Sequence, residues 1–240
     1  MLKTVRNIIR QSNKIVFLTG LGSIVECGGR DLWASDLFYS IEKEYHMCPE
    51  QLLSAGEFSS RKERFYEFYK KEVISYLPHP DETYEIMKSV EEQGNLESVV
   101  SFNIFGLEKL AGIKNLVEVA GSVYNNYCPK CLKTFDVDYL LSSRSIPYCD
   151  ECKKALRPNL RLLGERVDND LYTQAALHCF NADTIIVLGA DLGSSKVQYV
   201  TGHYKGNNLI LLTKEEKYGD RFADYTFYGS IKDNMKKLFV

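Results

Sequence analysis

Four of the seven cysteines in this 240-residue chain stand in two pairs whose spacing suits a metal site. Two residues separate Cys128 from Cys131, two separate Cys149 from Cys152, and 17 residues lie between the pairs. Each C-x2-C turn offers two thiolates on one side of a metal, and four thiolates form the tetrahedron that Zn²⁺ prefers. Because cysteine would fill all four positions, no place remains for water, and the pattern predicts a structural zinc site. The alternative is a set of four unligated thiols.

A glycine-rich turn near the N-terminus is the second place where chemistry is expected. The apolar run 15–18 leads into Thr19-Gly20-Leu21-Gly22. Glycines that follow a strand let the backbone approach a pyrophosphate closely, with N–H groups free to donate. The same residues also suit a tight turn that binds nothing, so the turn alone leaves both interpretations open.

Short apolar runs rich in β-branched residues alternate with amphipathic segments of helical length. Nearly continuous apolarity is typical of strands that are buried on both faces. The alternation predicts an α/β fold with a Rossmann-like, doubly wound parallel sheet. The expected strands are 15–18, 98–101, 116–119, 184–188 and 209–212, and the expected helices are 82–92 and 168–180.

Two stretches interrupt this alternation and are expected to form a small domain. Residues 34–80 are interpreted as a helical insertion and residues 124–158 as a zinc-ribbon module, which leaves 1–33, 81–123 and 159–240 for the Rossmann-like domain. An aromatic stripe recurs at helical spacing in the insertion, and we expect it to be core rather than an acyl or peptide pocket. The stripe consists of Phe65, Phe68, Tyr69, Val73 and Tyr76.

Composition and charge narrow the classes of function. Lysine and arginine number 30 against 32 aspartate and glutamate, a formal net charge of −2, so a primary role in binding nucleic acid is not expected. The sequence has no run of about 18 apolar residues and no recognisable signal peptide, so no membrane span is expected. An odd number of cysteines favours metal ligands and plain thiols in a reducing compartment, and we expect a cytoplasmic protein. Cys27, Cys48 and Cys179 are expected to be buried, inert thiols.

Taken in order, these motifs resemble those of the sirtuin family from Ile15 to the C-terminus. Residues 19–22 resemble the family's T-G-A-G phosphate turn, and residues 102–107 resemble its Q-N-I-D-G-L. Glu26, Gly28 and Asp31 match the E, the G and the D of the family's E-S-G-I-P-D-F-R segment.

The resemblance continues through the second half of the chain. Gly121-Ser122 stands where the family has H-G-S, and the cysteine pairs follow as they do in sirtuins. Further matches are Leu156-Arg157-Pro158 to L-R-P, Gly164-Glu165 to F-G-E, residues 187–192 to V-V-G-T-S-L, and Ala223, Asp224 and Gly229 to A-D-x-x-I-x-G.

This resemblance implies a Rossmann-like domain interrupted by a zinc-and-helix domain, with NAD or ADP-ribose in the cleft between them. In sirtuins NAD is a co-substrate: nicotinamide leaves, and the acyl oxygen of a modified lysine attacks the ribose. An acyl-lysine peptide or a partner protein would add as a strand to Leu162–Glu165. The implied nucleotide-binding residues are Gly20, Leu21, Gly22, Glu26, Asp31, Asn103, Gly189, Asp191 and Thr213.

The sequence departs from the family at the positions that carry the chemistry. Ala120 occupies the position of the histidine that acts as general base in sirtuins. Trp33, Phe102 and Phe105 replace an arginine, a glutamine and the aspartate that helps hold the nicotinamide carboxamide. These apolar side chains would either fill the nicotinamide pocket, which we favour, or stack on a flat ligand. Asp191 would either bind a ribose hydroxyl or, as we favour, cap the helix that starts near Gly193.

Three functions follow from this mixture. The favoured one is a sirtuin-like protein with structural zinc that binds NAD or ADP-ribose and is a weak or inactive protein-lysine deacylase. The first alternative is an NAD-dependent ADP-ribosyltransferase or deacylase that uses a non-standard base. The second is a protein-interaction module from which the nucleotide has been lost.

Overall fold

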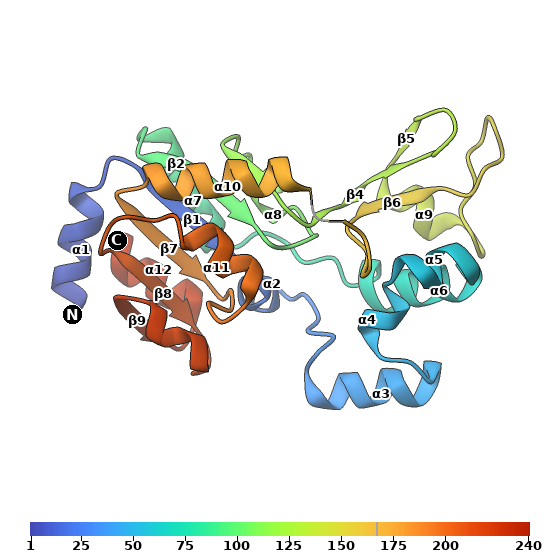
Figure 1. Ribbon diagram of the computed structural model, residues 1–240, viewed down its shortest axis with the longest axis horizontal. Coiled ribbons are helices and arrows are strands. Elements are labelled where there is room, and N and C mark those ends of the chain that lie inside the picture. Colours follow the sequence, from blue (N-terminus) through green and yellow to red (C-terminus); the bar gives the residue numbers. More distant parts are fainter. Residues whose placement is uncertain (167) are drawn as a thin grey trace. The chain divides into compact units, whose positions relative to one another are not determined.

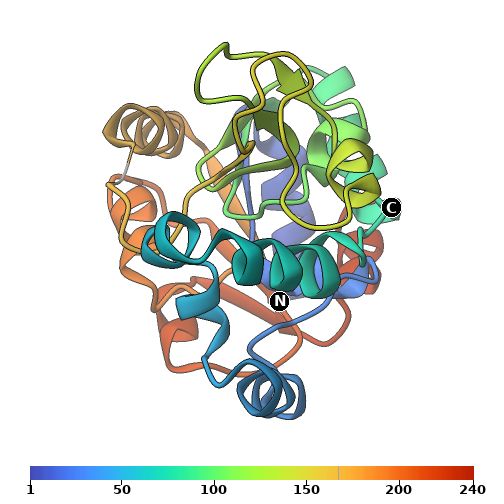
Figure 2. The same cartoon turned by 90° about the vertical axis from the view of Figure 1, so that its right-hand side faces the viewer.

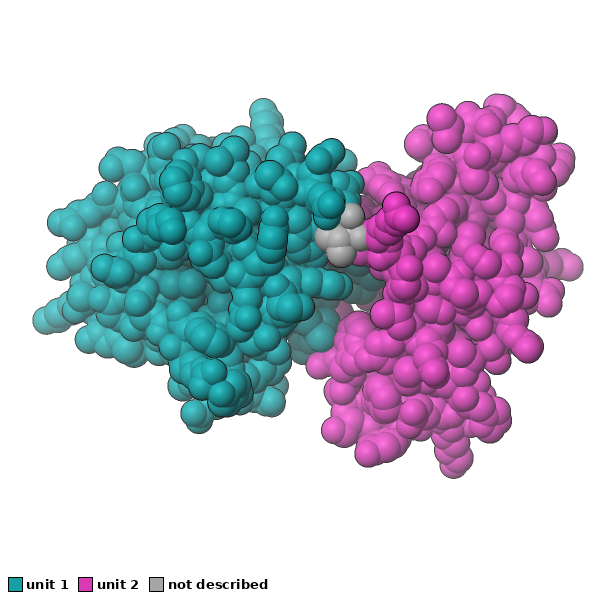
Figure 3. All heavy atoms as spheres, in the orientation of Figure 1, with its two compact units in different colours: residues 1–27, 78–119, 168–240 teal, residues 28–77, 120–167 magenta. Residues whose placement is uncertain are grey.

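The computed structural model describes residues 1–166 and 168–240, and the chain divides into two compact units (Figure 3). The first comprises residues 1–27, 78–119 and 168–240, and the second comprises 28–77 and 120–167. The second unit is wider than the expected small domain. Residues 120–123 and 159–160 belong to it because two of its strands pair with each other from Gly121↔Leu160 to Tyr127↔Arg157.

A single parallel sheet forms the centre of the first unit (Figure 1). Every pair of neighbouring strands in it is parallel, as expected for a doubly wound fold. Strands β1, β7 and β8 are buried along their whole length, which explains their continuous apolar sequences. In spatial order the strands are β3 (Leu116–Glu118), β2 (Leu96–Ser101), β1 (Ile15–Thr19), β7 (Thr184–Leu188), β8 (Leu209–Thr213) and the unforeseen edge strand β9 (Tyr225–Tyr228).

Helices cover both faces of this sheet. On one face α10 (Asn169–Asn181) and α11 (Ser195–Thr201) bury their apolar sides against Val16 and Leu18 of β1. On the other face Phe17 meets Phe239 of α12 (Ile231–Phe239), with 5.9 Å between the ring centroids. The remaining helical segments of this unit are α1 (Leu2–Gln11), α2 (Leu21–Glu26), α7 (Glu82–Glu92), α8 (Leu107–Leu110) and the 3₁₀ turn η2 (Tyr218–Phe222).

The second unit combines a small antiparallel sheet with a group of short helices (Figure 2). The sheet contains β5 (Thr134–Phe135), β4 (Gly121–Tyr127) and β6 (Arg157–Leu160). The insertion expected as a helical pair is a longer series, because Pro49 starts an additional helix and Ser54 caps the next one. Its elements are α3 (Ser35–Tyr45), α4 (Pro49–Leu52), α5 (Ala55–Ser60), α6 (Lys62–Phe68) and the π-helix η1 (Tyr69–Ile74), and α9 (Val137–Ser142) lies in the zinc-bearing segment.

The aromatic stripe of the insertion is core, with one exception. Phe65, Phe68, Tyr69 and Val73 are buried, as expected. Tyr76 is 47% exposed, so the expectation was wrong for this residue. Hydrogen bonding widens to the π pattern after Tyr69, as in the Ser75 N–H to Lys70 C=O bond, and the helix ends at Ile74. A spacing argument that assumes 3.6 residues per turn therefore loses register before Tyr76.

Two turns at the carboxyl edge of the large sheet touch backbone to backbone. The Gly20 N–H donates to the Leu188 carbonyl at 2.9 Å, and the Gly22 N–H donates to the Gly189 carbonyl at 3.0 Å. A Cβ atom on Gly20 would lie 2.3 Å from Ala190 Cα, and one on Gly22 would lie 2.8 Å from Gly189 Cα. The glycines are therefore required by packing between the β1–α2 and β7–α11 turns, independently of any ligand.

Replacing Gly20 by alanine should lower the free energy of unfolding by about 3 kcal/mol, because two backbones would have to separate. Gly56→Ala is the matched control. The nearest atom to a Cβ there is Ser54 Oγ at 3.8 Å, and alanine in helix α5 should be neutral or stabilise by up to about 1 kcal/mol. Urea unfolding of the three proteins measures both effects, and equal stability of Gly20→Ala and the parent protein would contradict the packing argument.

Candidate functional site

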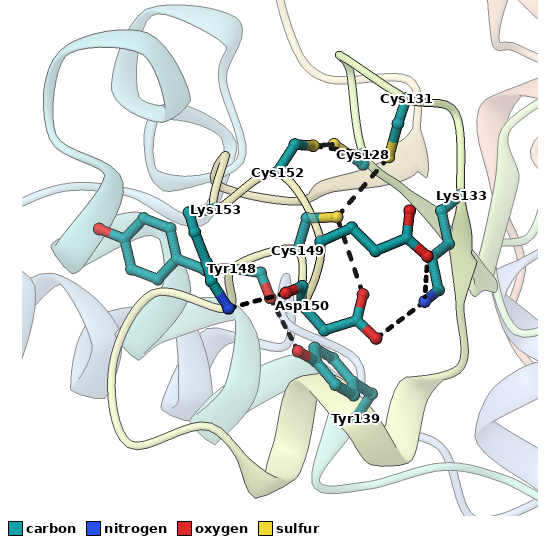
Figure 4. Close-up of polar contacts among 10 residues, drawn as sticks. Cys128, Cys131, Lys133, Tyr139, Tyr148, Cys149, Asp150, Cys152 and Lys153 are labelled. Carbon is teal, nitrogen blue, oxygen red and sulfur yellow. Dashed lines mark hydrogen bonds and ion pairs between the residues drawn. The ribbon is translucent and has the colours of Figure 1, made fainter.

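The four cysteines of the two pairs converge in the second unit (Figure 4). Their sulfur atoms all lie within 4.8 Å of one another. The Cys128–Cys152 distance is 3.2 Å, the Cys131–Cys149 distance is 3.6 Å, and the Cys131–Cys152 distance is 3.5 Å. A zinc ion with four Zn–S bonds of about 2.3 Å requires sulfurs roughly 3.8 Å apart, so this donor set fits tetrahedral zinc. The four cysteines are placed to bind zinc with no open position.

The two cysteine turns are built alike. The N–H groups of Cys128 and Cys149 donate to the carbonyls of Lys133 and Lys154, at 2.9 and 2.8 Å. Leu132 and Lys153 adopt the left-handed conformation, with φ of 61° and 55°, and donate back to the first cysteine of each pair. This tight turn aims both sulfurs of a pair to the same side, which is the local reason for the two-residue spacing.

Charged and aromatic side chains hold the two cysteine turns together. Lys133, from the first turn, donates to Asp150 at 2.8 Å and to Glu151 at 2.9 Å in the second. The Tyr139 hydroxyl on α9 donates to the Tyr148 carbonyl at 2.8 Å (Figure 4). These contacts lie between the two cysteine turns and support the arrangement of the four sulfurs.

The remaining cysteines are not part of a metal cluster among the described residues. Cys179 is fully buried, and burial raises the pKa of its thiol to about 12. Burial and the nearby Asp81 carboxylate raise the pKa of Cys27 to about 12 as well. Thiols with such pKa values carry almost no thiolate near neutral pH, which supports the expected inert role. Cys48 is half-buried.

The carboxyl ends of the central strands gather several of the expected nucleotide-binding residues. Thr19 at the end of β1 pairs in register with Ser101 of β2 on one side and Leu188 of β7 on the other. The strand order reverses between β1 and β7, and ligands of doubly wound sheets bind outside the carboxyl ends at such a switch point. The turns that follow these strand ends contain Gly20, Leu21, Gly22, Asn103, Gly189 and Asp191, and Thr213 ends the next strand.

The glycine turn has fewer free donors than its sequence indicates. The N–H groups of Gly20 and Gly22 are bonded to strand β7 and the residue that follows it. Leu21 and Ser23 belong to the first turn of α2, where backbone N–H groups lack an intrahelical acceptor. An anion at this turn would therefore be bound by the N–H groups of Leu21 and Ser23, because those of Gly20 and Gly22 are already bonded within the fold.

Asn103 is the clearest sign of a missing ligand in the first unit. Its side chain is only 7% exposed, and its amide nitrogen has no partner among the described residues. A buried donor without a partner costs about 1–3 kcal/mol, so such groups usually mark a bound molecule or water. Glu108 is a neighbouring case that sequence reasoning missed. It accepts the Thr19 hydroxyl with Oε1, while Oε2 is buried and unpartnered.

Other expected ligand residues serve the fold itself. The Glu26 carboxylate accepts the N–H groups of Ile231 at 2.7 Å and Lys232 at 2.9 Å, so it caps α12. Asp191 Oδ1 accepts the Gly193 N–H at 2.7 Å, but α11 begins at Ser195 with Ser194 as its N-cap, so the expectation that Asp191 caps this helix was wrong. The Thr213 hydroxyl donates to the Glu215 carbonyl at 3.3 Å. In the second unit, Asp31 accepts the Trp33 N–H at 2.9 Å.

The three aromatic replacements divide into two groups. Phe105 is 8% exposed and Phe102 packs against the core on the α10 side of the sheet, so both are packing residues as favoured. Trp33 is 47% exposed and donates its indole N–H to Glu50, so the expectation of filling was wrong for this residue. The polar indole N–H finds its acceptor at the surface, and the ring stays there with it.

The segment Leu162–Glu165 is already bridged on one edge. Leu163 donates to the Leu53 carbonyl at 3.0 Å and accepts from Ala55 at 2.9 Å. Glu165 bonds the Leu162 N–H at 2.9 Å and also pairs with Arg157. A peptide strand would therefore have to add along the other edge. The Leu163 side chain is 56% exposed beside it.

Within the part of the chain that the structure describes, every helix is too short or too polar to cross a membrane.

Comparison with known proteins identifies what this architecture is similar to. A family model described as "Sir2 family" matches residues 20–198. An NAD-dependent protein deacetylase of Clostridium acetobutylicum is 33% identical over 231 residues, which cover 96% of this chain and 94% of that protein. A Sir2 histidine-to-alanine variant with deacetylated peptide and 3′-O-acetyl ADP ribose has a TM-score of 0.84 at 27% identity, covering 99% and 96% of the two chains. Sir2 bound to acetylated peptide has a TM-score of 0.82 at 26% identity, covering 99% and 97%.

Removing the metal should unfold the second unit, since zinc binding contributes directly to the folding of such sites. We expect chelation, or the substitution Cys128→Ala, to lower the melting temperature by about 10 °C or more. Cys48→Ala, which removes a cysteine outside the cluster, should change it far less. Differential scanning calorimetry with metal analysis of each sample makes the comparison, and unchanged melting after verified loss of zinc would show that the site is not structural.

Proposed function

Because this chain belongs to the Sir2 family of sirtuins, we propose that it binds NAD or ADP-ribose at the carboxyl edge of its large sheet and acts as a weak or inactive protein-lysine deacylase. Similar proteins are named as NAD-dependent deacetylases or hold acetylated peptide and acetyl ADP ribose. The observation that supports binding is the buried, unpartnered amide nitrogen of Asn103, in a turn at the carboxyl edge of the sheet. An acyl-lysine peptide, docked along Leu162–Glu165, is the proposed partner, and the cytoplasm is the proposed location.

Weak turnover follows from the side chain that stands at the base position. Ala120 offers a methyl group where the family resemblance places a histidine, and a positioned base contributes about 10²–10⁴ in rate. Phe105 adds a second loss, because a buried phenyl ring cannot hydrogen-bond a carboxamide. Binding and turnover therefore differ in this proposal. The Asn103 amide can still donate to a nucleotide, whereas Ala120 cannot accept a proton.

One observation favours residual turnover through a non-standard base. Glu118 is the last residue of strand β3 and stands two residues before Ala120 in the chain. Burial raises the pKa of the Glu118 carboxyl, opposed by Lys109 and reinforced by Glu108. A raised pKa brings a carboxylate closer to the range useful for proton transfer at neutral pH. Any nicotinamide release should then be lost in Glu118→Gln.

The direct test is calorimetric titration of the zinc-loaded protein with NAD and with ADP-ribose, followed by chromatography of the same samples for nicotinamide. We expect binding of both ligands with little or no nicotinamide released. Asn103→Ala should weaken binding about tenfold, because it removes the buried donor, whereas Asn181→Ala at an exposed position of α10 should not. Absence of binding would leave the protein-interaction module, and rapid nicotinamide release would show that the base is not missing.

Restoring the base alone should not restore efficient deacylation. We expect Ala120→His to raise the rate of acetyl-lysine turnover by less than about tenfold, since Phe105 still occupies the place of the carboxamide contact. The double change Ala120→His with Phe105→Asp should gain more than the sum of the single changes. Steady-state deacetylation assays of the three variants decide, and full activity in the single Ala120→His variant would refute the role given to Phe105.

A further inference from the structure

A solvent-open cavity of 440 Å³ lies on the second unit, at the turn between α5 and α6. Its lining comprises the last residue of α5, Arg61 and the first three residues of α6, together with Ile146 from the loop after α9. The lining contains three cations and one carboxylate, in a chain whose net charge is −2. The lining residues are Ser60, Arg61, Lys62, Glu63, Arg64 and Ile146.

The three cations differ in how far their charge is already neutralised. Arg64 donates twice to the buried Glu57 carboxylate, at 2.5 and 2.9 Å, and this hydrogen bond raises the pKa of Arg64. Lys62 donates to the neutral Ser59 carbonyl at 3.1 Å and lies 5.1 Å above the Phe58 ring. Arg61 is exposed, and its guanidinium has no acceptor in residues 1–166 and 168–240. Arg61 and Lys62 therefore retain uncompensated charge.

The two walls of the cavity are fixed to each other. The Lys70 ammonium, two turns after Arg61 along the same helical segment, donates to the Ser143 carbonyl at 2.8 Å, the Ser143 hydroxyl at 3.1 Å and the Ser145 carbonyl at 2.5 Å. These bonds hold the loop that carries Ile146 against the helix. A cavity that exists before binding loses little conformational entropy when it is filled.

We propose that this cavity binds an anionic group, a carboxylate or a phosphoryl group, of the peptide substrate. The planar guanidinium of Arg61 suits two parallel hydrogen bonds to such a group, and Lys62 adds a second positive charge. The side chain of Ile146 gives the anion a low-dielectric wall, which strengthens its attraction to both cations. Glu63, also in the lining, carries a negative charge that opposes an anion, and the two charges of Arg61 and Lys62 outweigh it.

The link to the peptide comes from helix α5. Its first residue, Ala55, donates to Leu163 in the segment where the peptide is proposed to dock, and its last residue, Ser60, lines the cavity. Six residues of α-helix span about 9 Å. The peptide would lie along the other edge of this segment, one strand spacing of about 4.8 Å beyond Leu163, and it advances about 3.3 Å per residue. An anionic side chain about four residues from the docking point therefore reaches the cavity. The choice of a peptide as the source of the anion rests on the proposed function, whereas the anion site itself does not.

The test uses fluorescent acetyl-lysine peptides with Asp-Asp or Asn-Asn placed three and four residues to either side of the lysine. We expect one Asp-Asp peptide to bind about tenfold tighter than its Asn-Asn counterpart at low ionic strength, with the preference shrinking as salt rises. The double variant Arg61→Gln with Lys62→Gln should reduce the preference to less than about twofold. Lys43→Gln removes an exposed cation of the same unit outside the cavity and should leave it intact. A preference that survives the double variant would overturn the proposal.

A second arm uses inorganic phosphate without peptide, followed by backbone NMR shifts. We expect perturbation of residues 60–64 and 146 in the parent protein and none in Arg61→Gln. If no peptide binds but phosphate produces this pattern, the anion site stands and peptide docking fails. If peptides bind without an Asp preference while phosphate binds, free oxyanions are the ligand and the peptide assignment is wrong. If neither ligand depends on Arg61, the cavity is not an anion site.

Discussion

The contact between two glycine-containing turns is the constraint on which the first unit depends. Gly20 and Gly22 lie so close to Gly189 and Ala190 that no side chain fits between the two backbones, and two hydrogen bonds lock the approach. This contact sits where the strand order of the sheet reverses, so it fixes both β1 and β7 at the edge where a nucleotide would bind. The turn consequently has two duties, and packing alone is sufficient to explain why its residues are glycine.

Some motif positions of this chain are therefore required by the fold itself, independently of any catalytic role. Glycines at the turns and cysteines in the small unit are needed for folding, since their loss would separate backbones or remove a metal. Phe105 packs in the core and Ala120 stands in a turn, so apolar side chains at these two positions are compatible with the fold. The glycine and cysteine motifs of this chain are therefore explained by stability, and they do not by themselves establish an activity.

The sequence predicted those features that depend on local chemistry. The cysteine spacing located the metal site, and continuous apolar runs located β1, β2, β7 and β8. It did not predict the edge strand β9, because its half-exposed residues lack the apolarity of a buried strand. Glu26 was misleading for a different reason: its partners, Ile231 and Lys232, lie more than 200 residues away in the chain. Likewise, nothing in the sequence around Glu108 shows that this carboxyl is buried beneath Thr19.

The Glu26 carboxylate, which caps α12, connects this helix to helix α2. Helix α2 begins at the glycine turn and ends at Glu26, and α12 spans Ile231–Phe239. A displacement of α12 would therefore act, through one carboxylate and six helical residues, on the glycine turn at the proposed nucleotide site. A change that displaces α12, such as a substitution or a fusion that alters this helix, would therefore disturb the proposed nucleotide site, although α12 is remote from the glycine turn in the sequence.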